Sequence, residues 1–197
     1  PLHVILGMSE LFQDTPLNAT QRDLLKTLQV SSESLLQLIN DFLDVSKIEA
    51  SQVEIASFVF DFGELLASTV ELMRVRAQLK GLEVNLQVRE GVPVSLLGDA
   101  NRLRQILINL MNNAVKFTHS GSISVQASPV HAAEVPSTPD TASPKTLRFS
   151  VTDTGAGISE ADQTRLFEAF VRAQSGLRAQ EGAGLGLTMS AEYVQLL

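Results

Sequence analysis

The most informative absence from this 197-residue sequence is that of cysteine. Without cysteine there is no disulfide framework, no thiolate metal site and no cysteine nucleophile. Histidine is scarce as well, and its three residues (His3, His119 and His131) are too few to suggest a histidine-rich metal site. Only 15 Lys and Arg stand against 22 Asp and Glu, which gives a formal net charge of −7. This balance argues against nucleic acid as a partner, because neutralising phosphates needs clustered positive charge.

Long apolar runs are missing too. No stretch approaches the ~20 apolar residues of a membrane span, and no signal-peptide pattern opens the chain. The chain starts at Pro1 and runs straight into an apolar periodic segment, so we interpret it as a piece of a longer protein. We expect this piece to be cytoplasmic without membrane contact, although the parent could be membrane-anchored. What is present is 44% apolar and 19% charged residues, a composition that supports a core.

The first quarter of the chain predicts two helices joined by a short loop. Apolar residues recur every three to four positions over 2–12, residues 14–16 (DTP) interrupt the pattern, and a longer helix is predicted from about 20 to 52. Asn18 and Gln21 have the spacing of a capping box at the start of that helix. Its near-heptad apolar positions are Leu25, Leu28, Leu35, Ile39 and Phe42. Such a hairpin forms either the wall of one globular core or half of a dimeric four-helix bundle, and the heptad spacing favours the bundle.

The remaining sequence mixes strands and helices without strict alternation, which predicts an α+β sandwich. The predicted strands are 53–60, 82–88, 94–97, 122–127 and 147–151. The predicted helices are 61–80, 100–117, 160–171 and 187–197, the first with Asp61 and Glu64 spaced as in a capping box. Between two of the strands, 128–146 holds four of the seven prolines and is predicted to be a disordered or loosely ordered insertion.

The predicted helix over 100–117 carries the first chemical signal. We assign one apolar stripe to Leu103, Ile106, Leu107, Leu110, Ala114 and Phe117. Another face carries Gln105, Asn109, Asn113 and Lys116, since residues three and four apart are neighbours. Three asparagines within five positions are costly in a helix interior. They form either a solvated polar face or a set of amide oxygens for a hard cation such as Mg²⁺, with Lys116 placed for a phosphate.

Two glycine-containing segments follow. Residues 153–157 (DTGAG) come after a predicted strand, where the Asp153 carboxylate can accept a hydrogen bond from an exocyclic amine and Gly155 and Gly157 let a flat ring approach the backbone. Residues 182–187 (GAGLGL) precede the last helix, and their N–H groups can bind an anion. The second segment is neither a Walker A loop nor a dinucleotide fingerprint. Taken alone, the first could be a plain turn and the second a flexible hinge.

In this order, these segments resemble the core of sensor histidine kinases. The segments that resemble the N, G1, F and G2 boxes of that family are 109–118 (NLMNNAVKFT), 153–157 (DTGAG), 166–170 (LFEAF) and 182–187 (GAGLGL). Upstream, 1–7 (PLHVILG) resembles the segment just after the phosphoacceptor histidine. Residues 38–50 (LINDFLDVSKIEA) resemble the end of the second dimerisation helix. The resemblance therefore covers nearly the whole chain.

The resemblance implies a dimerising hairpin over 1–52 and, over 53–197, an ATP-binding α/β sandwich of the GHKL type shared with gyrase, heat-shock-90 chaperones and MutL. It implies that Asp153 holds the adenine amine and that Asn113, with Asn109, ligates Mg²⁺. The further nucleotide-binding residues that it implies are Gly155, Gly157, Phe167, Phe170, Gly182, Gly184, Leu185 and Gly186.

The same resemblance names two cations that contact phosphates and are candidate catalytic residues. They are Lys116 and Arg178, the latter from a mobile lid over 171–181 that would reach the γ-phosphate. The implied partners are a second copy of the chain, through the hairpin, and a response-regulator receiver domain. The implied cofactors are ATP and Mg²⁺.

The sequence departs from the family pattern at both ends. The family's phosphoacceptor histidine would lie upstream of Pro1, and His3 sits about seven residues further along without the acidic neighbour of the acceptor. The closing strands of the family are missing after the last helix. We therefore expect a protein-histidine kinase core that does not autophosphorylate by itself.

Two other functions stay open from the sequence. The first is an ATPase of the gyrase or chaperone kind. Those relatives carry a general-base Glu where Asn109 stands, and an amide cannot take a proton from water, so this residue favours transfer over hydrolysis. The second is a nucleotide-binding or dimerisation module without catalysis.

Overall fold

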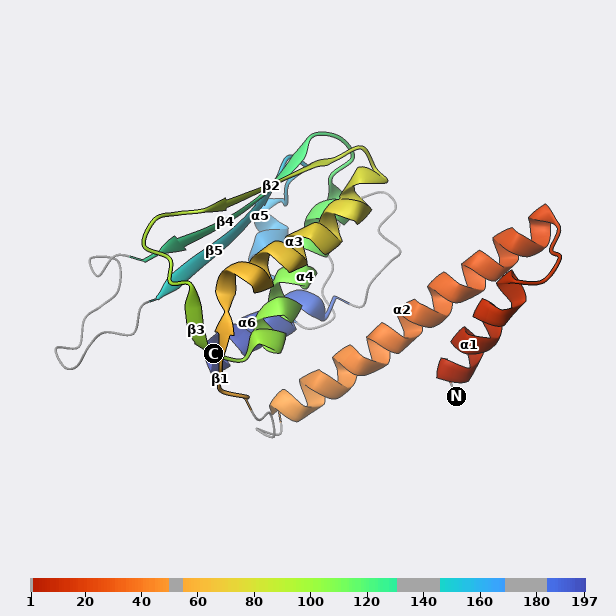
Figure 1. The fold of residues 1–197 in the computed structure, drawn as a ribbon, viewed down its shortest axis with the longest axis horizontal. Helices are drawn as coiled ribbons and strands as arrows, with labels where there is room; N and C mark the ends of the chain where they lie inside the picture. The colour runs from red at the N-terminus through yellow and green to blue at the C-terminus, as the bar shows by residue number, and fades with distance from the viewer. Residues whose placement is uncertain (1, 50–54, 131–145, 169–183) are drawn as a thin grey trace.

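The computed structural model describes residues 2–49, 55–130, 146–168 and 184–197. A long helical hairpin extends from one end of a more compact unit of helices and strands, so the molecule is elongated (Figure 1). The hairpin consists of α1 (Leu2–Gln13) and α2 (Ala19–Glu49). This arrangement confirms the predicted fold class, a helical hairpin followed by an α/β sandwich.

The loop of the hairpin is fixed by a reciprocal cap at the start of α2. The Gln21 N–H donates to the side-chain oxygen of Asn18, and the Asn18 N–H donates to the side-chain oxygen of Gln21, each at 2.9 Å. Both bonds satisfy backbone donors that the helix itself cannot pair. The capping box predicted from the sequence is thus confirmed. The predicted end of this helix, 50–52, lies outside the described residues.

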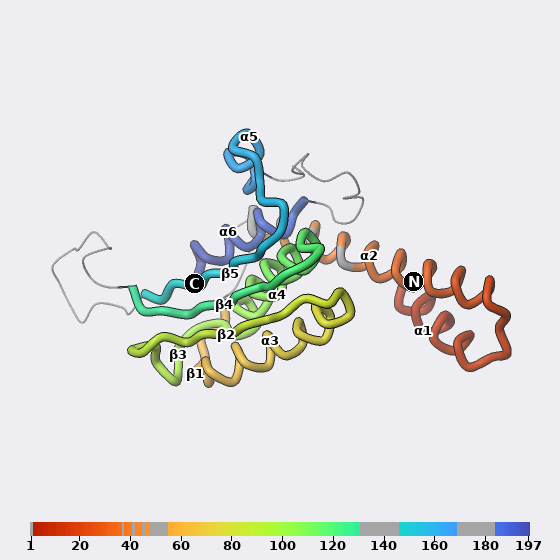
Figure 2. The backbone as a smooth tube through the Cα atoms, turned by 90° about the horizontal axis from the view of Figure 1, so that it is seen from above, coloured from red at the N-terminus to blue at the C-terminus, as the bar shows by residue number. Residues whose placement is uncertain are grey.

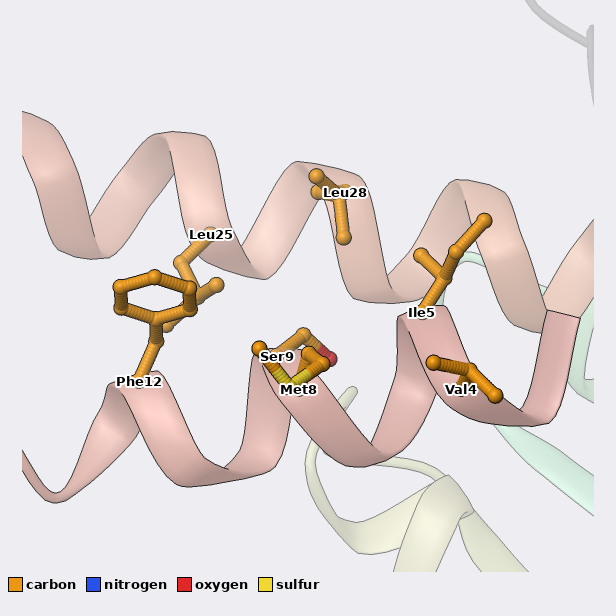
Figure 3. A pocket seen from close by; sticks show the side chains of 7 residues that line it. All are labelled: Val4, Ile5, Met8, Ser9, Phe12, Leu25 and Leu28. Carbon is orange, nitrogen blue, oxygen red and sulfur yellow. The ribbon is translucent and has the colours of Figure 1, made fainter. Parts of the chain in front are cut away.

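The two helices of the hairpin enclose an apolar groove that stays open to solvent. Apolar side chains of α1 and α2 face one another across it, as Figure 3 shows for Phe12 and Leu25. The groove is lined by Val4, Ile5, Met8, Ser9, Phe12, Leu25 and Leu28. In α1 only Ser9 is fully buried, and its hydroxyl donates to the Leu6 carbonyl at 2.7 Å. The hairpin by itself therefore buries little of its apolar surface.

The compact unit contains a three-stranded sheet and a separate pair of strands. In the sheet, β4 (Ser122–Pro129) lies between β2 (Glu83–Val88), which is parallel to it, and β5 (Leu147–Asp153), which is antiparallel. The antiparallel pair is formed by β1 (Phe58–Asp61) and β3 (Ser95–Gly98). The strand that carries the first glycine-containing segment, β5, is thus at the edge of the sheet.

Helices α3 (Phe62–Gln78) and α4 (Ala100–Phe117) lie side by side against one face of the sheet (Figures 1 and 2). The last helix, α6 (Gly186–Leu196), packs on α4. Fully buried residues of the core between the sheet and the first two helices include Leu66, Met73, Leu107, Met111, Ile123 and Val125. Asp61 caps α3 as expected, with its side chain accepting from the Glu64 N–H at 2.8 Å. Helix α4 has the predicted bounds.

The apolar residues of α4 are divided between two neighbours. Leu107 and Ala114 pack into the core against the sheet, whereas Ile106 and Leu110 belong to a second cluster. The other members of this α4–α6 cluster are Leu185, Met189 and Tyr193. Phe117, the last residue of the predicted stripe, is exposed. The predicted stripe is therefore shared between the sheet and α6, a division that periodicity alone does not give.

Two predicted elements need correction. The strand predicted over 53–60 begins only at Phe58, and the helix predicted over 160–171 is a four-residue α5 (Glu160–Gln163) followed by turns to residue 168. Just beyond α5, the Thr164 hydroxyl donates to the Ala161 carbonyl at 2.9 Å. Such a side-chain bond competes with continuation of the helical ladder.

The insertion predicted over 128–146 begins later and ends earlier than expected, because the two flanking strands pair further. Strand β4 continues to Pro129, and the Val130 N–H donates to the Thr146 carbonyl at 2.9 Å. Cross-strand pairing therefore carries the ladder beyond the predicted boundary, in spite of the proline. Residues 131–145 lie outside the described part of the chain.

Candidate nucleotide-binding site

A buried carboxylate fixes the start of α4, the helix that carries the asparagines. One oxygen of Asp99 accepts hydrogen bonds from the N–H groups of Asn101 and Arg102, each at 3.0 Å. The other oxygen accepts from the Ala56 N–H at 3.1 Å. This cap satisfies the first donors of the helix and places a negative charge at its positive end. It therefore fixes how α4 presents its polar face.

The end of α4 and the end of β5 meet at Gly155. The Gly155 N–H donates to the Asp153 carboxylate at 2.8 Å. A Cβ on Gly155 would lie 2.6 Å from the Phe117 carbonyl oxygen and 2.7 Å from Asp153 Oδ1, so no side chain fits there. Gly157 has φ +73°, a left-handed conformation that favours glycine. The structure thus brings the exposed Asp153 carboxylate close to the end of the asparagine-bearing helix. Sequence reasoning described these two segments separately and did not predict this contact.

Thr154, which sequence reasoning overlooked, ties this turn to the start of β4. Its hydroxyl donates to the Ser120 carbonyl at 3.2 Å and accepts from the Ser122 N–H at 3.1 Å. Gly121, at φ +110°, leaves room for it, since a Cβ there would lie 2.2 Å from the Thr154 hydroxyl. The only sequence signal for this contact is the position of Thr154 inside the 153–157 motif.

The three asparagines in the second half of α4, Asn109, Asn112 and Asn113, differ in their neighbours. The Asn109 amide Nδ2 donates to the hydroxyl of Ser190 on α6 at 2.8 Å. Asn112 points to α3, where its Oδ1 accepts from Arg76 at 3.1 Å. Asn113 is half-buried and makes no hydrogen bond to another described residue. The side chains therefore divide into one bound to α6, one bound to α3 and one without a hydrogen bond to the described residues.

Lys116, one turn after the asparagines, lies at the same end of α4 as the Gly155 turn. Its ammonium is 5.1 Å from the centroid of the Phe117 ring, a cation–π contact. The contact holds a positive charge near the meeting point of α4 and β5.

The last glycine-containing segment is described from Gly184 onward. Gly184 has φ +72°, and Leu185 packs its side chain into the α4–α6 cluster. A Cβ on Gly186 would lie 2.2 Å from Asn109 Oδ1, so the start of α6 closely approaches that amide. Phe167 is exposed, and its carbonyl accepts from the Thr188 hydroxyl of α6 at 3.0 Å. The F-box segment is thereby linked to the same helix.

Three of the predicted site residues, Phe170, Arg178 and Gly182, lie outside the described residues, as does the predicted lid over 171–181. Among the described residues, no group of three or more His, Cys, Asp or Glu could hold a metal ion. Asn109 and Asn113 carry neutral amide oxygens, which can ligate a hard cation.

A second polar cluster, which sequence reasoning missed, joins the hairpin to the compact unit. The Arg102 guanidinium donates to the Tyr193 hydroxyl at 2.7 Å and to the Gln105 side chain at 3.0 Å. It also lies 4.6 Å from the Tyr193 ring centroid and 3.5 Å from the Asp44 carboxylate of α2. Arg102 thus links α2, α4 and α6. No periodic pattern in the sequence indicates this contact.

Comparison with known families gives a match to each of the two parts. Residues 98–197 match the family of histidine kinase-, DNA gyrase B- and HSP90-like ATPases. The chain belongs to this family. Residues 1–51 match the His Kinase A (phospho-acceptor) domain, so a phospho-acceptor-type domain precedes the ATPase-type domain in one histidine kinase core.

Individual relatives match along nearly the whole chain. The chain is 40% identical over 196 residues to the sensor histidine kinase GacS of Pseudomonas protegens, covering 99% of the chain and 20% of that protein. It is 39% identical over 198 residues to the sensory/regulatory protein RpfC of Xanthomonas campestris, covering 100% of the chain and 26% of that protein. The chain thus spans about a fifth to a quarter of the length of these relatives.

Among solved structures, the chain is similar to full-length ShkA, which was crystallised in complex with AMPPNP. The TM-score is 0.76 at 37% sequence identity, and the match covers 99% of this chain and 38% of ShkA.

These findings confirm the resemblance to a sensor histidine kinase core. The boundary between the two domains is predicted between residues 52 and 53. Residues 50–54 lie outside the described part of the chain, so the position of this boundary stays a prediction. Within the described ranges, no helix combines the length and the apolar character needed to cross a membrane.

Proposed function

We propose that this chain is the dimerisation and ATP-binding core of a sensor histidine kinase that transfers the γ-phosphoryl group of Mg-ATP to a histidine of its parent. From that histidine the group would pass to an aspartate of a response-regulator receiver domain. The observation that supports the proposal best is the junction at Gly155. There an exposed carboxylate, a turn without side chains and the end of the asparagine-bearing helix lie together.

The adenine end of the nucleotide would bind at Asp153. One carboxylate oxygen already accepts the Gly155 N–H at 2.8 Å, a bond that orients the carboxylate toward the turn. A carboxylate fixed in this way can accept a hydrogen bond from the exocyclic amine of adenine. Gly155 and Gly157 would let the flat ring approach the backbone.

The phosphate end would bind between α4 and the segment before α6. Asn113 and Asn109 would supply neutral oxygen ligands to Mg²⁺, which usually binds few protein groups when nucleotide phosphates complete its shell. The magnesium ion would neutralise charge on the transferred phosphoryl group. Lys116 and Arg178 would contact phosphates, with Phe167, Phe170, Gly182, Gly184, Leu185 and Gly186 forming the rest of the pocket.

Transfer rather than hydrolysis is supported by the side chain at position 109. The amide of Asn109 donates to Ser190 and has no basic group that could accept a proton from water. An ATPase of the gyrase type, which needs that base, is therefore the second candidate. A non-catalytic nucleotide-binding module is the third. We also propose that the core works in the cytoplasm.

A homodimer would form through the hairpin. Most of its apolar groove-lining and heptad residues are exposed, among them Leu35 by 48% and Phe42 by 56%, in a domain whose family match is the phospho-acceptor domain. Pairing two hairpins into a four-helix bundle would cover these side chains.

Nucleotide binding is tested by calorimetric titration of the chain with ADP and Mg²⁺. Asp153→Asn should weaken ADP binding at least tenfold and leave the melting temperature unchanged. The change replaces a charged carboxylate, which only accepts hydrogen bonds, with a neutral amide of the same size. Asp23→Asn, which removes the same charge from an exposed position of α2, serves as the matched control. Equal affinities of wild type and Asp153→Asn would contradict the adenine role of Asp153.

Phosphoryl transfer is tested with γ-labelled ATP and Mg²⁺ on two chains. The present chain should take up no acid-labile label, because in-line transfer needs the acceptor within about 3–3.5 Å of the phosphorus. His3 lies about seven residues from the expected acceptor position, roughly 10 Å along a helix. A chain extended at both ends to include the acceptor and closing strands should be labelled. Label on His3 would overturn the assignment of the acceptor.

A further inference from the structure

Lys80 lies in the turn that follows α3, and its side chain reaches the end of α4. The ammonium donates to the Val115 carbonyl at 2.9 Å and to the Lys116 carbonyl at 3.4 Å. These carbonyls belong to the last turn of α4, where a helix has no N–H groups of its own left to pair with them. A positive charge there also interacts favourably with the negative end of the helix dipole. Lys80 therefore caps α4 from a position 35 residues before Val115 in the chain.

The turn that carries Lys80 has a fixed backbone. The Leu82 N–H donates to the Ala77 carbonyl at 3.0 Å, and the Gly81 N–H donates to the Gln78 carbonyl at 2.9 Å. This pair of bonds is a Schellman motif, which needs a left-handed residue, and Gly81 supplies it with φ +71°. Ala77 and Leu82 are both buried in the core. Core packing on both sides of the turn therefore sets the point from which the side chain of Lys80 extends.

The capped end of α4 is also the end that meets the Gly155 turn. The next carbonyl along the chain is that of Phe117, and a Cβ on Gly155 would lie 2.6 Å from its oxygen and 3.1 Å from its carbon. The helix end and the turn are thus closer than a methyl group would allow. The same turn orients Asp153, whose carboxylate accepts from the Gly155 N–H at 2.8 Å. A shift of the last turn of α4 would therefore either press on Gly155 or leave a gap beside it.

We propose that Lys80 is a positioning residue for nucleotide binding: it holds the last two capped carbonyls of α4 and thereby keeps the end of that helix against the turn that orients Asp153. The inference rests on the proposed binding of adenine at Asp153. Lys80 acts through the backbone of α4 and is not assigned a contact with the nucleotide itself.

A purely structural role of Lys80 gives a different expectation. If the ammonium only joins α3 to α4, then its removal lowers stability, but the ADP affinity of the folded protein stays the same. If it positions the end of α4, then its removal also weakens ADP binding, and the loss depends on an intact Asp153. Calorimetric titrations with ADP and Mg²⁺, made well below the melting temperature of every variant, separate the two readings.

The variants are Lys80→Met, Lys80→Arg and Arg76→Met. Lys80→Met keeps the length of the side chain and removes its charge, whereas Lys80→Arg keeps a positively charged donor. Arg76→Met is the matched control, because Arg76 is also exposed and also joins α3 to α4, but it donates to the Asn112 side chain at 3.1 Å and not to an end carbonyl. For Lys80→Met we expect an ADP affinity reduced about fivefold, the size of one lost hydrogen bond. Lys80→Arg should restore most of it, and Arg76→Met should stay within about twofold of wild type.

A double-mutant cycle with Asp153→Asn shows where the effect is exerted. In that background the carboxylate that the turn orients is already absent, so adding Lys80→Met should weaken ADP binding by less than about twofold. In the background of Asp23→Asn, which removes the same charge from an exposed position of α2, Lys80→Met should keep its full effect.

An unchanged ADP affinity in Lys80→Met would overturn the inference, as would an equal loss in Lys80→Arg or Arg76→Met, or an undiminished loss in the Asp153→Asn background. The proposed function fails separately, namely when wild type binds no ADP or when Asp153→Asn alone leaves the affinity unchanged. The two failures are therefore distinguishable in one set of titrations.

Discussion

The hairpin leaves most of its apolar side chains exposed, whereas the compact unit buries many of its own. In the hairpin, Leu35 and Phe42 remain about half exposed, whereas Leu66 and Leu107 of the compact unit are 1% exposed. The compact unit can close because two helices cover one face of a sheet. Two helices alone can bury only the sides that face each other. The hairpin therefore leaves apolar surface uncovered, while the compact unit has its own core.

The two regions also differ in the kind of contact that joins them. Asp44 of α2 reaches Arg102 at 3.5 Å, and both side chains are partly exposed. Partly exposed ion pairs contribute little to stability, about 0–1 kcal/mol. This ion pair thus contributes little to the junction compared with the packing in the core of the compact unit.

The largest expected difference between the regions concerns the loss of one leucine side chain. Leu107→Ala should lower the free energy of unfolding of the compact unit by about 3 kcal/mol, because it opens a cavity in a closed core. Leu35→Ala should cost less than about 1 kcal/mol at protein concentrations where the chain is monomeric, because that side chain is already half exposed. Denaturant unfolding followed by circular dichroism measures both. Similar losses would contradict the contrast between a closed core and an open hairpin.

A Gly→Ala pair sharpens the same comparison. Gly155→Ala should lower the free energy of unfolding by about 1–3 kcal/mol and weaken ADP binding at least tenfold. The added Cβ would lie 2.6 Å from the Phe117 carbonyl oxygen, a backbone atom that cannot easily move. The matched control is Gly7→Ala, in α1, where nothing lies within 4 Å of an added Cβ. There alanine should stabilise the helix by up to about 1 kcal/mol. Thermal unfolding and ADP titration report both effects, and a tolerated alanine at 155 would show that the turn is not as close as described.

Self-association is the next effect in size. Leu35→Ala should raise the dimer dissociation constant at least tenfold, because each copy loses one leucine whose full burial is worth roughly 1.5–3 kcal/mol. Leu72→Ala, at a similarly exposed leucine of α3, should leave association unchanged. Light scattering over a range of protein concentrations measures the mass. A monomer at every concentration, or equal effects of the two variants, would argue against dimerisation through the hairpin.

The smallest expected effect is on the junction. Asp44→Asn should change the melting temperature by less than about 2 °C, because the pair with Arg102 is partly exposed. It should nevertheless allow the hairpin to move relative to the compact unit, which small-angle scattering would detect as a broader distribution of distances.

Salt gives an independent check of that junction. High salt should broaden the distance distribution of the wild type and have little further effect on Asp44→Asn, because screening weakens the same charge pair. Identical scattering of wild type and variant at low salt would show that the other α2 contacts are sufficient to hold the two regions together.

The sequence by itself determined those features that depend on neighbours along the chain. The capping boxes at Asn18 and Asp61 could be predicted because their partners are three residues away. The bounds of α4 could be predicted because its periodicity ends in turn residues. The order of the N, G1, F and G2 boxes was likewise readable, and it was sufficient to indicate the family that the comparisons established.

Only the tertiary structure decided which side chains far apart in sequence meet. Residues 109 and 190 form one hydrogen bond across 81 positions, and Arg102 reaches Tyr193 across 91. Periodicity shows that a helix has an apolar side but not which element covers it, so the division of α4 between the sheet and α6 could not be foreseen. The physical reason is that packing joins surfaces rather than neighbouring residues. Local propensity depends only on residues a few positions apart. The partner of Asn109, in contrast, depends on where α6 packs against α4.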